Sequence, residues 1–129
     1  MLYRIIIAGS RDFTDYEKLC SACDAIIAGL TANDAQSEIV IISGGARGAD
    51  KLAEQYAREK KYKNNIIKAK WDRYGKKAGY LRNAVMADKA TARNGQGCLI
   101  AFWDGKSHGT RHMIDIAEKK KMHVSIIGF

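Results

Sequence analysis

The sequence predicts an α/β protein in which helices cover both faces of a five-stranded parallel sheet. Five apolar runs alternate with four segments of helical periodicity, which is the pattern that this architecture leaves in a sequence. Three of the runs are apolar almost without a break, as strands buried on both faces must be. The chain has 129 residues, enough for one domain with a core and too few for two. We therefore expect a single three-layer α/β/α domain over residues 1–129.

The strands and helices follow from these runs in chain order. The expected strands are Tyr3–Ala8, Glu38–Ser43, Asn65–Ala69, Gly97–Trp103 and Met122–Ile127. The expected helices are Tyr16–Leu30, Ala49–Lys61, Lys77–Ala92 and Thr110–Lys121, and the least regular segments are Thr31–Ser37 and Trp71–Gly79. Lys68 in the third strand, and His123 and Ser125 in the fifth, place these two strands at the edges of the sheet. The predicted strand order is 3-2-1-4-5, with a ligand crevice where the order reverses, beyond the carboxyl ends of strands one and four.

A glycine-rich junction joins the second strand to the second helix. Residues 43–50 read Ser-Gly-Gly-Ala-Arg-Gly-Ala-Asp. Glycines let the backbone approach an anion closely, and the first amides of a helix lack intrahelical partners and carry partial positive charge. Gly44, Gly45, Arg47 and Gly48 are therefore candidate phosphate-binding residues. The alternative is a tight turn in which glycine supplies a positive φ and Asp50 favours the helix start.

Two other strand-to-helix loops carry similar residues. The candidates are Gly9, Ser10 and Arg11 after the first strand, and Asp104, Gly105, Ser107, Gly109 and Thr110 after the fourth. Serine can donate to a phosphate oxygen, and the forked guanidinium of arginine suits phosphate or carboxylate. Some polar residues here are expected to cap helices instead: Thr14 or Asp15 in the first loop, and Ser107 or Thr110 in the fourth. Capping does not explain three such loops at one sheet edge, so we expect a phosphate-bearing ligand.

The cysteines and histidines do not indicate a metal site. Cys20, Cys23 and Cys98 are expected to be small core residues, and a redox or metal role for Cys20 and Cys23 is the alternative. His108 and His112 have the spacing of a metal-binding helix face but lack the acidic partner pattern, so we expect solvated histidines. We predict no metal site and no cofactor.

The formal charge of +8 and the pI near 9.5 favour anionic partners. A nucleotide-like small molecule is the expected partner. A single-stranded nucleic acid is the second choice, because Trp71 and Tyr74 lie among the basic residues of 68–77, where aromatic rings can stack on bases. No apolar stretch is long enough to span a bilayer or to form a signal-peptide core, so we expect no membrane partner and a cytoplasmic location. Formation of a homodimer is left open.

Four motifs occur in order along nearly the whole chain: Gly9-Ser10-Arg11; the junction of residues 43–50; Trp71 through Gly79 to Arg82-Asn83 and Met86; and Asp104-Gly105-Lys106-Ser107-x-Gly109-Thr110. Together they resemble the YspA-like proteins of the SLOG superfamily. That superfamily is Rossmann-like and includes the Lonely Guy phosphoribohydrolases, the DNA-processing protein of natural transformation, and sensor domains for ADP-ribose-like nucleotides. The resemblance implies a nucleotide or nucleotide-derived ligand, bound by a sensor or sequestering protein, with Arg82 and Asn83 added to the candidate site.

Only parts of the two Lonely Guy signatures are present. Arg82–Met86 matches Arg-Lys-x-x-Met except for Asn83, and Gly109-Thr110 matches the centre of Pro-Gly-Gly-x-Gly-Thr-x-x-Glu, whose glutamate position falls on Met113. Methionine can neither activate water nor stabilise an oxocarbenium-like centre. We therefore place binding without turnover ahead of nucleoside-monophosphate hydrolysis. In the hydrolytic alternative, Arg82 stabilises charge and Asp50 or Asp104 replaces the glutamate, whereas in the binding interpretation Asp50 holds ribose hydroxyls.

Overall fold

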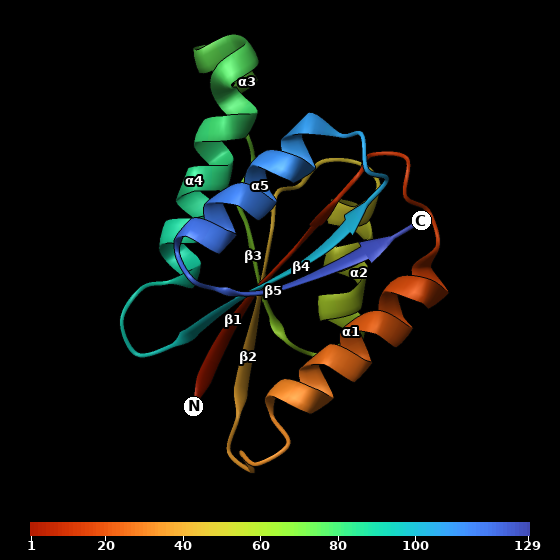
Figure 1. Ribbon diagram of the computed structural model, residues 1–129, viewed down its shortest axis with the longest axis vertical. Helices are drawn as coiled ribbons and strands as arrows, with labels where there is room; N and C mark the ends of the chain where they lie inside the picture. Colours follow the sequence, from red (N-terminus) through yellow and green to blue (C-terminus); the bar gives the residue numbers. More distant parts are fainter.

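A five-stranded parallel sheet in the order β3-β2-β1-β4-β5 forms the centre of the computed structural model, which describes residues 1–129 (Figure 1). Its strands are β1 (Leu2–Gly9), β2 (Glu38–Ser43), β3 (Lys63–Ile66), β4 (Gln96–Trp103) and β5 (His123–Gly128). Its helices are α1 (Tyr16–Leu30), α2 (Ala49–Lys60), α3 (Trp71–Tyr74), α4 (Ala78–Ala90) and α5 (His108–Lys119), with a 3₁₀ turn over Gly75–Lys77. The predicted Rossmann-like α/β class and the predicted strand order are confirmed.

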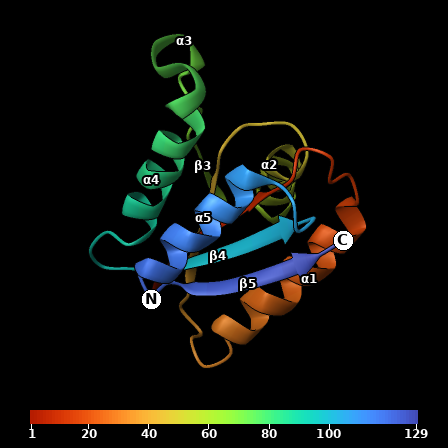
Figure 2. The same cartoon turned by 45° about the horizontal axis from the view of Figure 1, so that its top comes forward.

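The helices form two layers, with α1 and α2 on one face of the sheet and α4 and α5 on the other (Figures 1 and 2). Alternate residues of β1 supply the two cores, because successive side chains of a strand point to opposite faces. Ile5 and Ile7 pack against α1 and α2, whereas Ile6 and Ala8 pack against α4 and α5. Both faces of β1 are therefore buried, as its continuous apolar sequence predicts.

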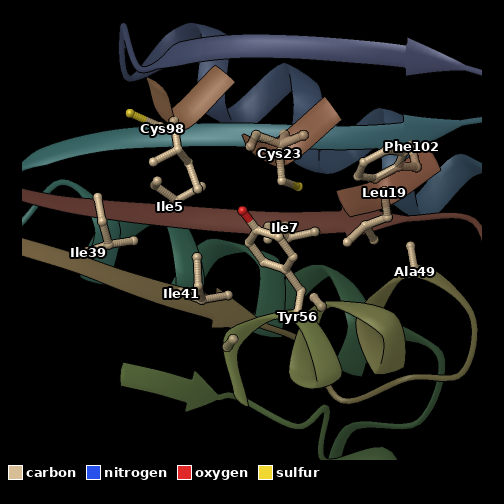
Figure 3. Close-up of a cluster of buried hydrophobic side chains, with 14 of the residues drawn as sticks. Ile5, Ile7, Leu19, Cys23, Ile39, Ile41, Ala49, Tyr56, Cys98 and Phe102 are labelled. Atoms are coloured by element: carbon tan, nitrogen blue, oxygen red, sulfur yellow. The ribbon is translucent and has the colours of Figure 1, made fainter. Parts of the chain in front are cut away.

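The core beneath α1 and α2 is built from large side chains. Tyr56 of α2 lies among the isoleucines of β1 and β2 (Figure 3). Its hydroxyl donates to Asp24 Oδ1 at 2.6 Å. Phe13 stacks on Phe102 with ring centroids 4.8 Å apart. Cys23 and Cys98 are buried in this core, and all three cysteines of the chain are free thiols.

The core beneath α4 and α5 is built from smaller and more flexible side chains. Ala8 and Ala101 are paired in register near the carboxyl ends of β1 and β4. Met86 of α4 and Met113 of α5 pack against the same cluster. The short side chain of Ala8 leaves room above it, beside Met86 and Met113, and a pocket opens there.

Several predicted boundaries differ from those of the structure. The third strand is Lys63–Ile66 instead of Asn65–Ala69, because Ile67 N donates to Ser43 O at 2.8 Å and the chain then leaves the sheet. Residues 71–77, predicted as irregular, form α3 and a 3₁₀ turn, since the carbonyl oxygen of Lys70 accepts from the amides of Arg73 and Tyr74. The last helix also begins two residues earlier than predicted, at His108. No helix is both long and apolar enough to cross a membrane.

Candidate functional site

A pocket of about 420 Å³ opens at the carboxyl end of the sheet, at the β1–β4 boundary where the strand order reverses. We call it the main pocket. Its lining comes from all three predicted loops and from the α3–α4 region. The lining residues are Ala8, Gly9, Ser10, Arg11, Asp12, Ala46, Arg47, Asp50, Trp71, Lys76, Gly79, Tyr80, Arg82, Asn83, Met86, Ser107, Gly109, Thr110 and Met113.

Most of the predicted site residues are therefore brought together. Gly44 and Gly45 line a smaller adjoining hollow instead. Gly48, Asp104 and Gly105 line neither cavity. These three residues lie outside both cavities and hold the loops in place.

The loops after β1 and β4 are joined by a serine pair. Ser10 is buried, and its amide donates to Phe102 O at 2.9 Å. Its hydroxyl lies 2.9 Å from the Ser107 hydroxyl. A side chain at Gly9 would collide with the Phe102 carbonyl oxygen, so the two loops approach each other closely because position 9 is glycine.

Asp104 organises the start of α5. Its Oδ1 accepts from the amides of Lys106 at 2.9 Å and Ser107 at 2.8 Å, and also from the Ser107 hydroxyl. These donors favour the ionised form and lower the pKa of the Asp104 carboxyl to about 2. Gly105 makes the turn between them with φ +79°. Asp104 is thus an anionic loop anchor that does not face the main pocket.

Gly48 sets the position of the glycine-rich junction. It is the residue before α2, with φ +79°, and a Cβ there would lie 2.5 Å from the carbonyl oxygens of Ser10 and Arg11. Positive φ is costly for any residue with a side chain. The junction therefore packs directly on the β1–α1 loop, which brings Arg47 to the same pocket as Arg11.

Arg82 is the most constrained cation of the site. Its Nη1 donates to Gly44 O at 2.7 Å, and its Nε donates to Asn83 Oδ1 at 3.0 Å. A Cβ at Gly44 would occupy the space of the Arg82 guanidinium and of Asp50 Oδ2. Burial lowers the pKa of Arg82, while the nearby Asp50 carboxylate acts in the opposite direction.

Asn83 connects the helix that carries Arg82 to α5. The Asn83 amide nitrogen donates to Gly109 O at 3.1 Å and lies 3.2 Å from His112 Nδ1. The residue is 4% exposed. The Asn83 amide group therefore contacts α5 through its nitrogen and Arg82 through its oxygen. Asn83, which stands at the lysine position of the Lonely Guy signature, thus has a structural role. Burial lowers the pKa of His112, so the predicted solvation holds for the exposed His108 and not for His112.

Asp50 is a buried carboxyl group in the wall of the main pocket. It is 5% exposed, and Oδ2 accepts from the Ala46 amide at 3.2 Å and lies 4.0 Å from Arg82 Nη1. Burial raises the pKa of Asp50 to about 6, because the opposing effects of Arg82 and the Ala46 amide do not fully offset desolvation. The side chain can accept from ligand hydroxyls when it is ionised.

The outer wall of the pocket is aromatic and basic. The Arg11 guanidinium lies 5.9 Å from the centroid of the Trp71 ring, and Trp71 is half-exposed. Tyr80 stands against His112, with ring centroids 4.5 Å apart. Tyr80 and Lys76 also line the pocket and were not among the predicted site residues. Of the α4 wall, Arg82 and Asn83 were among the predicted site residues. The helical spacing of Gly79, Arg82, Asn83 and Met86 places all four on one face, and this signal also indicates Gly79 and Met86.

Two helices reach the main pocket with uncapped starts. No side chain caps the first turn of α2 or of α5, and Asp50, Gly109 and Thr110 in those turns line the pocket. The first amides of a helix carry partial positive charge, and Arg11, Arg47, Lys76 and Arg82 add full charges around the same space. The arrangement is suited to a small anion with hydroxyl groups attached.

Comparison with known proteins identifies a family and a relative of this chain. A family model described as the YspA, cpYpsA-related SLOG family matches residues 3–74. The Gene 61 protein of Mycobacterium phage D29 is 34% identical over 131 residues, which cover 98% of this chain and 95% of the phage protein. No solved structure matches the chain.

Proposed function

Since the chain belongs to the YspA, cpYpsA-related SLOG family, we propose that it binds a nucleotide or a nucleotide-derived phosphate in the main pocket, as a sensor or sequestering protein. The observation that carries this proposal is the meeting of the two uncapped helix starts with three arginines at the point where the strand order reverses. A phosphate is the ligand group that best matches free backbone amides and guanidinium groups together.

The parts of such a ligand have distinct partners in this proposal. The phosphate lies at the start of α5, where Thr110 and Arg11 line the pocket. Asp50 accepts hydrogen bonds from ribose hydroxyls. The base packs against the half-exposed rings of Trp71 and Tyr80, since aromatic faces stack on any base. The family relationship supports nucleotide-related binding in general and leaves the identity of the base to experiment.

The test is calorimetric titration of a panel of nucleoside monophosphates, nucleoside diphosphates and ADP-ribose. Arg11→Ala and Arg47→Ala should each weaken the tightest ligand by about 1.5–3 kcal/mol, the range for hydrogen bonds to charged groups. Arg58→Ala is the matched control, because this exposed residue lies in the last turn of α2, away from the pocket. Unchanged affinity in both pocket variants would refute the arginine assignment. Nanomolar, stacking-dependent oligonucleotide binding at physiological salt would favour a nucleic-acid ligand instead.

Hydrolysis of a nucleoside monophosphate is the second candidate function. One observation favours it: Asp50 combines a raised pKa with a position beside Arg82 in the pocket wall, and perturbed carboxyl groups in clefts are frequent at catalytic sites. Binding without turnover remains first, because Met113 stands where the Lonely Guy signature has its glutamate and Asp104 is held by its own loop. Chromatography for free base and ribose 5-phosphate decides between the two. Release that is lost in Asp50→Asn would establish the hydrolytic candidate.

A further inference from the structure

Asn83 joins two residues of the pocket wall to a titratable ring outside it. Its Oδ1 accepts from Arg82 Nε at 3.0 Å, and its Nδ2 donates to Gly109 O at 3.1 Å. The same nitrogen lies 3.2 Å from His112 Nδ1. Arg82 and Gly109 line the main pocket, whereas His112 does not. These contacts bridge α4 and α5, which lie side by side on one face of the sheet (Figures 1 and 2).

The contacts allow only one orientation of the Asn83 amide. The N–H at Arg82 Nε can only donate, so it must meet the amide oxygen, and the Gly109 carbonyl can only accept, so it must meet the amide nitrogen. A flipped amide would set donor against donor and acceptor against acceptor. The second hydrogen of Asn83 Nδ2 is then left for His112 Nδ1, which must accept it. The His112 ring is therefore neutral, with its proton on Nε2.

Protonation of His112 would set a second donor against the Asn83 amide nitrogen. No orientation of Asn83 satisfies an imidazolium, the Arg82 guanidinium and the Gly109 carbonyl at once. Asn83 is buried, and a buried polar group that loses its partner is costly. The ring or the amide must then move, and this movement reaches both Arg82 and the first turn of α5.

The groups packed around the His112 ring include both signs of charge. Burial lowers the pKa of His112, while Asp115 raises this pKa and Lys119 lowers it. Asp115 also lies 4.0 Å from Arg111, one turn away on α5. On α4, Tyr80 packs on the ring with centroids 4.5 Å apart. Burial and the Asn83 contact therefore act in the same direction, since both favour the neutral ring.

The other elements packed against α5 add few charges. Asp88, farther along α4, pairs with Lys120 at 2.9 Å. Strand β4 has no charged residue, and the one charged residue of β1, Arg4, donates to the carbonyl groups of residues 92 and 93. Strand β5 carries only His123, at its first position. None of these groups replaces the acceptor that Asn83 finds in the neutral ring.

We infer that His112 is a positioning residue whose neutral ring holds Asn83, and through it Arg82 and the start of α5, in the arrangement that binds the ligand. Protonation of His112 releases these contacts and weakens binding in acid. The inference rests on the proposed function, because it places the ligand between Arg82 and α5. Its sign differs from that of charge alone, since a positive ring near an anion would strengthen binding at low pH.

The experiment measures the affinity of the full chain for AMP and for inorganic phosphate by calorimetry from pH 4.5 to pH 8. Asp50 and the phosphate groups also titrate in this range, so the measured quantity is the ratio of the affinities of the wild type and His112→Asn at each pH. Asparagine places Oδ1 as many bonds from Cβ as the ring places Nδ1, and it does not titrate. As the pH falls through the midpoint of the ring, this ratio should decrease by about 3- to 10-fold, as expected for the loss of one or two hydrogen bonds.

Two further variants identify the contact. His112→Leu removes the acceptor and should bind about 3- to 10-fold more weakly than the wild type at pH 7.5, and His112→Asn should recover most of that loss. His108→Asn is the matched control, because it replaces an exposed histidine one turn earlier on α5 that does not line the main pocket. It should keep the wild-type pH profile. Thermal unfolding confirms that each variant is folded.

Nuclear magnetic resonance tests the contact in the protein without a ligand. At pH 7.5 the ring nitrogen signals of His112 should be those of the neutral form with the proton on Nε2. The side-chain amide signals of Asn83 should shift with the same midpoint as the ring. In His112→Asn, the ring signals should disappear and the Asn83 amide should no longer respond to pH in this range.

Each contrary outcome has a distinct meaning. A His112 ring with its proton on Nδ1, or Asn83 signals that do not follow the ring, overturns the inference whatever the ligand. An affinity ratio that stays constant with pH, or that favours the wild type in acid, overturns it and leaves the proposed function standing. Failure to bind AMP, inorganic phosphate or any other nucleotide overturns the proposed function and with it the effect on affinity, even where the ring and the Asn83 amide titrate together.

Discussion

Three helices begin at the same edge of the sheet, after β1, β2 and β4, but their first turns are completed in different ways. Helix α1 is capped by Asp15, whose Oδ1 accepts from the Lys18 amide at 3.0 Å. Helices α2 and α5 begin after Gly48 and Ser107, and neither has a side-chain cap. The capped helix starts outside the main pocket, whereas the two uncapped helices start in its wall.

The difference separates residues that stabilise the fold from residues that keep a site open. A side-chain cap typically contributes about 0.5–2 kcal/mol, and α2 and α5 lack that contribution. The first amide of α2, Ala49 N, donates to Ser10 O at 3.3 Å. The other amides of the first turns of α2 and α5 have no side-chain acceptor, so an anion can bind them. The comparison therefore predicts that substitutions in α1 change only the stability of the fold. Substitutions at the junction before α2 should instead change ligand binding, the stability of the fold or the pH dependence of that stability.

The largest effect is expected from Gly48→Ala. A Cβ at this position would stand 2.5 Å from two backbone oxygens of the β1–α1 loop, and the residue would keep a φ of +79°. The positive φ alone costs roughly 1–3 kcal/mol, and neither backbone can move without breaking the contact between the loops. Urea denaturation should show a loss of roughly 3 kcal/mol or more in the free energy of unfolding.

The matched control is Gly29→Ala in α1. Apart from the chain neighbours and the backbone of α1 itself, no heavy atom lies within 4 Å of a Cβ at position 29, and the residue is helical. Alanine is the better helix former by about 0.5–1 kcal/mol, so this variant should be slightly more stable than the wild-type protein. Equal losses in the two variants would show that Gly48 has no special role in joining the loops.

The second prediction concerns the pH dependence of stability at Asp50. Its pKa rises from an ordinary 3.8 to about 6 on folding because the carboxyl is buried. The folded chain therefore binds this proton more tightly than the unfolded chain does. The contribution of Asp50 to stability is most favourable below about pH 4 and is lost as the pH rises through 6, by up to roughly 3 kcal/mol.

Asp50→Asn isolates this contribution. Other carboxyl groups, among them Asp24 and Asp104, have lowered pKa values and oppose the trend of Asp50 in the wild-type protein. The measured quantity is therefore the difference between wild type and Asp50→Asn in the free energy of unfolding, taken by urea denaturation at pH 4 and pH 7.5. As the pH rises, the wild-type protein should become less stable relative to Asp50→Asn. A difference that does not change with pH would mean that folding does not raise the pKa of Asp50.

The third prediction separates the position of Arg82 from the stability of the fold. In Gly44→Ala, the new methyl group would meet only the ends of the Arg82 and Asp50 side chains, which can move. The fold should remain nearly as stable, but the guanidinium should leave its hydrogen bond to residue 44. We expect about 1.5–3 kcal/mol weaker nucleotide binding by calorimetry. Gly128→Ala, which also has open space around its Cβ and no positive φ, should leave affinity unchanged.

The sequence predicted the sheet well because its central strands are buried on both faces and cannot avoid an apolar pattern. It misplaced β3 because Lys63, Asn64 and Asn65 form an edge strand without apolar residues, while Ile66 and Ile67 mark only its end. An edge strand with both faces exposed obtains its position from backbone pairing with β2, which leaves no trace in side-chain periodicity.

The same reasoning explains which site residues could be found. Glycines, serines and arginines at strand ends are local signals, so the three loops were identified. The different roles of Asp50 and Asp104 are not a local signal. The Asp50 carboxyl lies 4.0 Å from Arg82, a residue of α4, whereas the Asp104 carboxyl accepts hydrogen bonds from its own loop. The contact of Arg82 with Gly44 joins residues 38 positions apart. Such pairings depend on how α4 packs on the sheet, which no short segment of sequence specifies.

The smallest effect is expected from Asp15→Ala, and it tests the comparison from the side of α1. The variant removes the side-chain acceptor of the Lys18 amide and should lower the free energy of unfolding by about 1 kcal/mol. Asp15→Asn should recover most of that loss, since asparagine is also a good N-cap. Because α1 starts outside the main pocket, nucleotide affinity measured by calorimetry should be the same in both variants and in the wild-type protein. Weaker binding in Asp15→Ala would contradict the separation of stabilising residues from site residues. It would mean that the cap of α1 fixes the conformation of the β1–α1 loop, which carries Ser10 and Arg11. All three helix starts would then support the site together.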